Sequence, residues 1–117
     1  MITVIIDRSG DDIKGLYISG HSGYAEQGSD IICAAASTLF YTAANALEEL
    51  CSLKDTAEIH QDFTSDKVDA KIRIPDVDEG LRLKVRTIME TVVVGFRSLE
   101  MSVNDDDQYI ELIESRN

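Results

Sequence analysis

The sequence predicts a single α+β domain in which two helices pack on one face of a mostly antiparallel sheet, in the order ββαββαβ. Several short segments alternate apolar and polar residues as half-buried strands do, and two longer stretches repeat apolar residues at the spacing of amphipathic helices. A chain of 117 residues without a repeat, a linker or a low-complexity tract suits one domain over residues 1–117.

The N-terminal segment predicts a β-hairpin. Ile2, Val4 and Ile6 form one strongly apolar face of an alternating strand. Residues 8–12 (RSGDD) predict a turn around Gly10, and residues 13–19 predict the returning strand. Three glycines punctuate residues 20–29, which we expect to form an irregular, mobile loop.

Residues 30–51 predict the first helix. Ser29 or Asp30 can cap its start, and three consecutive alanines favour helix and permit close packing. The residues expected on its apolar stripe are Ile32, Leu39, Ala43, Ala46, Leu47 and Leu50.

A second hairpin follows, with strands at residues 56–64 and 67–74 and a turn at residues 65–66. The second strand alternates cleanly, so one of its faces should be wet. Pro75 ends this strand. The apolar residues of that strand are Val68, Ala70, Ile72 and Ile74.

Residues 77–101 predict the second helix, with Asp76 as its N-cap. The run from Val92 to Gly95 contains poorer helix formers and weakens this prediction. Residues 104–107 predict an acidic turn, and residues 108–114 a short final strand. The apolar residues that recur at helical spacing are Leu81, Val85, Ile88, Val92, Phe96 and Leu99.

The charge of the chain limits its partners. Eleven basic and 22 acidic residues give a net charge of −11. An acidic surface repels phosphates, so we expect no direct nucleic-acid binding and no binding to anionic membranes. A basic peptide or protein would be attracted, although acidity also serves solubility alone.

We expect a cytoplasmic protein. Residues 1–7 enter a strand-like pattern without the basic and apolar regions of a signal peptide, and no apolar run approaches the ~20 residues of a membrane span. Thiols stay reduced in the cytosol. On one helix, Cys33 and Cys51 would lie ~27 Å apart, too far for a disulfide. Cys51 is expected in the core, which leaves Cys33 to be explained.

The segment from Gly20-His21 to Cys33 is the one that suggests chemistry. With Asp30 as N-cap, Cys33 would be the third helical residue, where partial positive charge favours the nucleophilic thiolate. The N–H groups near Cys33 and Ala34 could then receive the oxyanion of a tetrahedral intermediate.

Histidine is the natural base at neutral pH, and a loop can bring His21 beside the thiol. Asp30 could orient the imidazole or simply cap the helix. Ser37, one turn after Cys33, could hydrogen-bond near the thiol, to a substrate or to a helical carbonyl.

Other interpretations of Cys33 and His21 stay open from the residues alone. A cysteine in an alanine-rich helix is usually a small buried hydrophobe, and a histidine beside glycine is usually a turn residue. A zinc site from His21, Cys33, Cys51 and His60 lacks paired ligand spacing. A redox sensor would lack a nearby resolving cysteine.

Residues 20–37 (GHSGYAEQGSDIICAAAS) resemble the signature of the Prp family of ribosomal-processing cysteine proteases, in which glycine, histidine, aspartate, cysteine and serine fall in the same register. The resemblance implies an enzyme that removes a short N-terminal extension from a large-subunit ribosomal protein, without metal or cofactor. It implies Cys33 as nucleophile and His21 as base, with Gly20 permitting movement of the histidine loop and Asp30 and Ser37 supporting the site.

The resemblance also implies a homodimer whose active-site loop closes over a basic ribosomal protein precursor. An alternative with the same partner is a non-catalytic assembly factor that binds the ribosomal protein, in which Cys33 would be unreactive.

Overall fold

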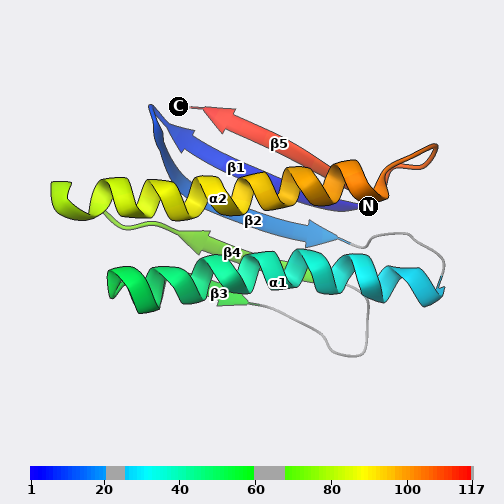
Figure 1. Cartoon of the computed structure of the whole chain (residues 1–117), viewed down its shortest axis with the longest axis horizontal. Coiled ribbons are helices and arrows are strands. Elements are labelled where there is room, and N and C mark those ends of the chain that lie inside the picture. Colours follow the sequence, from blue (N-terminus) through cyan, green and yellow to red (C-terminus); the bar gives the residue numbers. More distant parts are fainter. Residues whose placement is uncertain (21–25, 60–67, 117) are drawn as a thin grey trace.

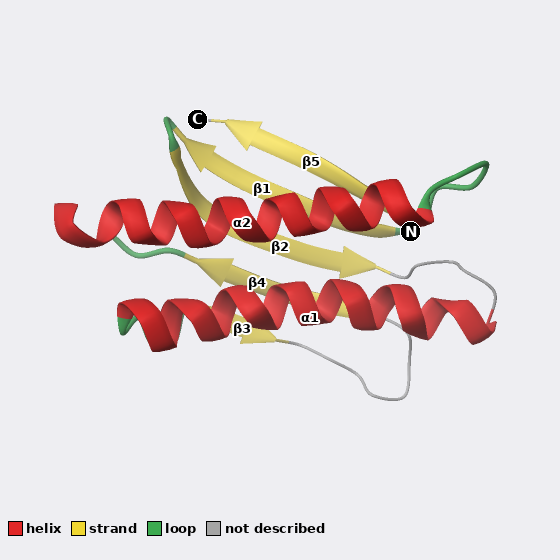
Figure 2. Cartoon of the chain, viewed as in Figure 1, coloured by secondary structure: helices red, strands yellow, loops and turns green. Residues whose placement is uncertain are grey.

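The computed structural model describes residues 1–20, 26–59 and 68–116 and confirms the predicted order ββαββαβ. Two helices lie side by side on one face of a five-stranded sheet (Figure 1, Figure 2). The elements are β1 (Ile2–Ser9), β2 (Asp12–Gly20), α1 (Glu26–Cys51), β3 (Ala57–Ile59), β4 (Val68–Arg73), α2 (Glu79–Val103) and β5 (Ile110–Arg116).

The sheet has the strand order β3-β4-β2-β1-β5 and is antiparallel except where β5 runs parallel to β1. Its register sets Val4 against Ile18 and Ile6 against Leu16, and all four side chains are buried. Because alternate residues of a strand point to one face, these residues form the layer on which both helices pack. The final strand starts two residues later than the sequence predicted.

The N-terminal hairpin is confirmed, but its turn is shorter than predicted. Arg8 belongs to β1, and only Gly10 and Asp11 form the turn, with Gly10 at a φ of +61°. The register shifts between Asp7 and Arg8, which marks a β-bulge. The prediction that Arg8 lies in the turn was wrong. Ion pairs with residues of other elements stabilise its guanidinium inside the fold.

The first helix begins at Glu26, four residues earlier than predicted, so Ser29 and Asp30 lie within it and neither is its cap. Glu26 and Gln27 are good helix formers, which allows the helix to extend through Gly28. Of the predicted stripe, Ile32, Ala43 and Leu47 are buried, and Leu39 and Ala46 are half-buried. Cys51 is buried, which confirms its predicted place in the core. Leu50 is exposed in the last turn, where helical spacing alone predicted it wrongly.

By length and composition alone, Ile31–Cys51 could cross a membrane, with a mean hydropathy of 1.2 and 33% of its residues buried. The sequence prediction missed this because it looked for an unbroken apolar run. Core helices of soluble proteins pass the same test, and α1 supplies Phe40 and Leu47 to the core against the sheet. The hydropathy of α1 therefore carries little weight as a membrane signal.

Within the described residues the second hairpin is present, with β3 (Ala57–Ile59) antiparallel to β4. Residues 60–64 of the predicted first strand lie outside the described residues. The predicted turn at residues 65–66 lies outside the described residues. Ala70 and Ile72 of β4 are buried while Asp69 and Arg73 are exposed, which confirms one wet face.

The second helix begins at Glu79, and its N-cap is Asp78 rather than Asp76. A side-chain oxygen of Asp78 accepts a hydrogen bond from the Leu81 backbone N–H at 3.1 Å. Asp76 lies two residues too early to make this bond.

No break interrupts α2 between Val92 and Gly95. Val92 and Val93 are buried in the core, so packing outweighs their weak helix propensity. A β-carbon on Gly95 would stand 2.6 Å from Cδ2 of Leu39, so glycine lets the two helices approach closely.

Candidate active site

Cys33 lies in α1 and is half-buried against the hydrophobic core. It is the eighth residue of a helix that starts at Glu26, so its predicted place in the first helical turn was wrong. Only the first four backbone N–H groups of a helix lack acceptors within it, and the N–H groups of Cys33 and Ala34 come later in α1. The start of α1 therefore does not supply the expected oxyanion donors at these two residues.

The other predicted residues of α1 surround Cys33 in different ways. Ala34 is exposed, and its carbonyl oxygen accepts a hydrogen bond from Thr38 Oγ1 at 2.8 Å. Ser37 is half-buried one turn after Cys33. Asp30 belongs to the part of α1 that the structure describes by backbone alone, so its contact with an imidazole stays a prediction.

Gly20 is the last residue of β2 and is held between two strands, facing Ile2 of β1 and Val68 of β4. Its φ is +109°, which side chains rarely adopt, and a β-carbon there would overlap the carbonyl oxygen of Met1. The fold requires glycine at this position, and the conformation of Gly20 sets the direction in which the chain leaves the sheet toward residue 21.

His21 and His60 lie outside the described residues, and so do the catalytic pairing and the zinc alternative that depend on them. The described residues contain no group of three or more histidine, cysteine, aspartate or glutamate side chains arranged to hold a metal ion. The topology still brings the described ends of the two flanking elements to one end of the molecule. The C-terminal end of β2 and the N-terminal end of α1 lie there together (Figure 1).

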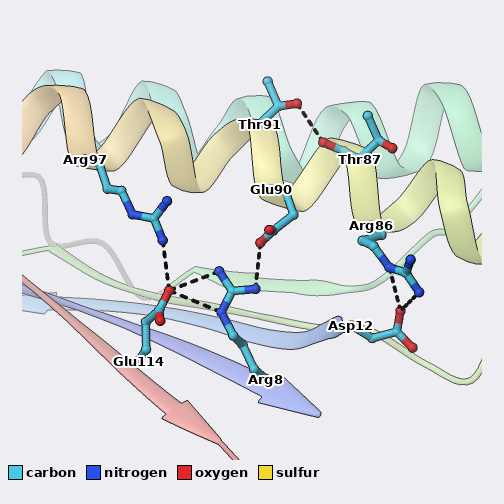
Figure 3. Close-up of polar contacts among 8 residues, drawn as sticks. All are labelled: Arg8, Asp12, Arg86, Thr87, Glu90, Thr91, Arg97 and Glu114. Carbon is cyan, nitrogen blue, oxygen red and sulfur yellow. Dashed lines mark hydrogen bonds and ion pairs between the residues drawn. The ribbon is translucent and has the colours of Figure 1, made fainter. Parts of the chain in front are cut away.

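Ion pairs join the sheet to α2 (Figure 3). Arg8 is only 6% exposed; its Nη1 lies 2.7 Å from Glu90 Oε1, and its Nη2 lies 3.0 Å from Glu114 Oε1. Arg97 contacts the same Glu114 oxygen at 3.0 Å. The hydrogen bond from Arg8 lowers the pKa of Glu114, against the opposing effect of burial. Sequence reasoning missed this network, although Arg8 falls in the alternation of Ile2, Val4 and Ile6.

A second ion-pair group lies at the N-terminal end of β2, the end opposite Gly20. Arg82 and Arg86 both contact Asp12, at 2.8 and 3.1 Å. The hydrogen bond from Arg82 is the main cause of the lowered pKa of Asp12. A small pocket beside these residues contains none of the predicted site residues and is lined by Asp12, Ile13, Lys14, Ile74, Val77, Arg82, Val85 and Arg86.

Comparison with known proteins gives one consistent result. The profile of the family described as cysteine protease Prp matches residues 1–110. The chain is similar to the ribosomal processing cysteine protease Prp of Bacillus subtilis (strain 168), with 27% identity over 108 residues, covering 91% of this chain and 93% of the relative.

Two solved structures have the same fold. SMU.848 from Streptococcus mutans matches with a TM-score of 0.79 and 26% identity, covering 100% of this chain and 96% of that one. The essential ribosomal processing protease Prp from Staphylococcus aureus, in complex with a covalently linked product peptide, matches with a TM-score of 0.71 and 25% identity, covering 98% and 100%.

Proposed function

Because the chain belongs to the cysteine protease Prp family and is a cysteine protease, we propose that it removes a short N-terminal extension from a large-subunit ribosomal protein. The observation that carries this proposal is the family match over residues 1–110, which spans the glycine, histidine, aspartate, cysteine and serine of residues 20–37. No observation favours the assembly-factor alternative, which needs an unreactive Cys33.

In this proposal, Cys33 is the nucleophile and His21 is the general base. The thiolate sulfur bonds to the scissile carbonyl carbon, and the C–N bond breaks as the imidazolium of His21 donates its proton to the leaving amine. His21 then takes one proton from water, whose oxygen displaces the sulfur, and the released carboxylic acid loses its remaining proton to solvent. Cys33 returns to its thiolate form, and no metal or cofactor is required.

The surroundings of the two cysteines support the choice of Cys33. Neither forms a disulfide, and Cys51 is only 4% exposed within the core, whereas Cys33 is half-buried. A thiol in the core cannot reach a peptide carbonyl without unfolding of its surroundings. The covalently linked product peptide on the Staphylococcus aureus relative fits a nucleophile of this kind.

The net charge of −11 supports a basic substrate, because opposite charges speed encounter. A ribosomal protein precursor is such a substrate, whereas nucleic acid and anionic membrane are not. We place the enzyme in the cytoplasm, where the thiol stays reduced, and we infer that it works as a homodimer, as the family resemblance implies.

The proposal is tested by mass spectrometry of a peptide that spans the extension junction, incubated with wild-type protein and with three variants. Wild type and Cys51→Ala should make one cut at the same bond. Cys33→Ala and His21→Ala should make none while retaining the wild-type circular dichroism spectrum. A cut by folded Cys33→Ala would overturn the assignment of the nucleophile.

Alkylation separates a protease from a binding protein without any substrate. In native protein at neutral pH, iodoacetamide should modify Cys33 well before Cys51, as followed by mass spectrometry of the two peptides. Denatured protein, in which both thiols are accessible, is the control. Equal and slow modification of both thiols in native protein would contradict a reactive Cys33.

A further inference from the structure

The two edges of the sheet are built differently. In the strand order β3-β4-β2-β1-β5, one edge is β5 and the other is β3. The unpaired main-chain groups of an edge strand can bond to a further strand, and many proteins cover them for that reason. In the part of the chain that the structure describes, side chains cover these groups in β5 and leave those of β3 open.

Side chains from the end of α2 close the first half of the β5 edge. The N–H of Ile2 donates to the carbonyl oxygen of Tyr109, so the main-chain groups of Ile110 point away from β1. Asn104 bonds to both of them: its Oδ1 accepts from the Ile110 N–H at 3.3 Å, and its Nδ2 donates to the carbonyl oxygen at 2.9 Å. A further strand would have to displace these bonds, so β5 is a poor edge for pairing.

The next outward N–H of β5 is covered in the same way. Leu112 donates its N–H to Glu100 Oε2 at 3.3 Å. Glu100 and Asn104 are one helical turn apart at the end of α2, so the helix that packs on the sheet also closes its edge.

The β3 edge is open at Ala57. The N–H of Arg73 in β4 donates to the carbonyl oxygen of Thr56 at 2.9 Å, so the main-chain groups of Thr56 face β4. Inward and outward groups alternate along an antiparallel strand, which turns the N–H and C=O of Ala57 and Ile59 away from β4. No described side chain or strand bonds to these groups of Ala57. This edge therefore offers a donor and an acceptor to an extended chain.

Cys33 lies on the side of α1 that faces away from α2. The half-buried residues of α1 form two stripes, one on each side of its buried stripe. Cys33 and Ser37 belong to one stripe, and Leu39 and Ala46 belong to the other. A β-carbon on Gly95 of α2 would contact Leu39, so the stripe of Leu39 faces α2. The stripe of Cys33 therefore faces the opposite way.

The two helices divide the sheet between them, which brings the stripe of Cys33 to the side of β3. α2 contacts β2 and β5, whereas α1 contacts β4, the neighbour of β3. The side of α1 away from α2 is thus the side nearest to the β3 edge (Figure 1). Because α1 ends at Cys51 and β3 begins at Ala57, β3 starts near the end of α1 and runs back along it toward Cys33.

We propose that the peptide substrate adds to the sheet as a further strand beside β3, with its main chain bonded to Ala57. An extended main chain is the ligand that an open sheet edge fits, and the β3 edge is the one on the side of Cys33. Cys33 lies ~27 Å along α1 from Cys51, and three strand residues span ~10 Å, so the paired part of the peptide stands several residues from the scissile bond.

This inference rests on the proposed function and adds to it the surface that binds the peptide away from the scissile bond. Pairing between main chains accepts many side chains, so β3 would hold the substrate extended and leave the choice of bond to the surroundings of Cys33. Such bonds exist in the bound substrate as well as in the transition state. They should therefore act on KM and leave kcat unchanged.

The test on the protein places proline at the two sheet edges. Ala57→Pro removes the outward N–H without removing a bond to β4, and proline is tolerated at such positions of edge strands. Arg116→Pro is the matched control, because the N–H of Arg116 points outward at the opposite edge and its side chain is exposed. Circular dichroism checks that both variants are folded.

With a peptide that spans the extension junction, Ala57→Pro should raise KM about tenfold and change kcat less than about twofold, with the cut at the same bond. Arg116→Pro should keep the wild-type values. Iodoacetamide, a reagent too small to use β3, should modify Cys33 at the same rate in all three proteins. This last measurement separates a lost peptide contact from a damaged thiol.

A series of junction peptides tests the pairing in the wild-type protein, whether or not Ala57→Pro folds. Each peptide carries one main-chain N-methyl group, which removes one N–H donor. On one side of the scissile bond, N-methylation of every second residue should raise KM, and N-methylation of the residues between should not, because only alternate N–H groups of an added strand face β3.

An unchanged KM in folded Ala57→Pro, or N-methyl effects that do not alternate, would overturn this inference and leave the proposed function intact. A lower mass of Ala57→Pro in sedimentation equilibrium, with an unchanged KM, would put a second copy of the chain on this edge and overturn the inference as well. Failure of the wild type to cut any of the junction peptides would instead overturn the proposed function, and this inference with it.

Discussion

Gly20 and Met1 approach so closely at the end of β2 that a β-carbon on residue 20 would overlap the carbonyl oxygen of Met1. The positive φ of Gly20 adds a second reason why no other residue fits. This contact immediately precedes His21, so a change in the backbone of Gly20 should change both stability and the placement of the proposed base.

We therefore expect Gly20→Ala to lose about 3 kcal/mol of unfolding free energy and most of its peptide cleavage. Gly10→Ala is the control, because Gly10 also has a positive φ but has open space around its α-carbon. It should lose about 1 kcal/mol and keep its activity. Urea unfolding and kcat/KM measure the two effects, and wild-type stability in Gly20→Ala would contradict the close contact.

The buried Arg8 should matter more than the exposed Arg82. Arg8→Met leaves Glu90 and Glu114 side by side without their shared cation, and we expect a loss of about 2 kcal/mol. The loss stays below that of a fully buried pair because both carboxylates retain contact with water. Arg82→Met should cost clearly less than Arg8→Met, because the ion pairs of Arg82 are exposed to water. Equal losses in urea unfolding would show that burial does not decide the strength of these pairs.

Acid should destabilise the protein through Glu114 and Asp12. Arginine hydrogen bonds lower both pKa values in the folded state from the ordinary 4.5 and 3.8. The unfolded chain therefore binds protons first, so this stability is complete above the ordinary pKa values and is lost as pH falls through the folded ones. Thermal unfolding from neutral pH downward should show Tm falling below about pH 4.5, less steeply in Arg8→Met. Parallel curves would remove Glu114 as a cause.

The N-cap of α2 can be tested by two neighbouring aspartates. Asp78→Ala removes the acceptor of the Leu81 N–H and should cost about 1 kcal/mol. Asp76→Ala should be nearly neutral, because Asp76 precedes the helix by too many residues to cap it. Chemical unfolding of both variants distinguishes them, and a larger effect of Asp76→Ala would favour the sequence prediction over the observed cap.

Peptide cleavage should weaken with salt. The chain carries −11, so kcat/KM for a basic junction peptide should fall about tenfold between low salt and high ionic strength. A peptide in which glutamine replaces the lysines and arginines outside the scissile bond is the control and should change little. The same salt dependence for both peptides would show that attraction between opposite charges does not guide the substrate.

Local patterns predicted the elements of this fold well because strand alternation and helical spacing are set by which side faces the core. They failed where a distant partner decides the outcome. Arg8 looked like a turn residue because its partner Glu114 lies 106 residues away in the sequence. For the candidate site, the motif identified Cys33, but the assumed helix start gave it the wrong surroundings, since helix ends depend on weak and local preferences.

The parallel pairing of β5 with β1 joins the first strand of the chain to the last, with Ile2 facing Ile110 and Arg8 facing Arg116. The chain loses entropy when it closes a loop of this length, before the contact between the two strands can stabilise it. We therefore expect the pairing of β1 with β5 to form late in folding. Until β5 arrives, β1 is an open sheet edge and Arg8 lacks Glu114. A nascent or truncated chain would thus pass through a state with an exposed apolar strand edge, which is prone to associate with other chains.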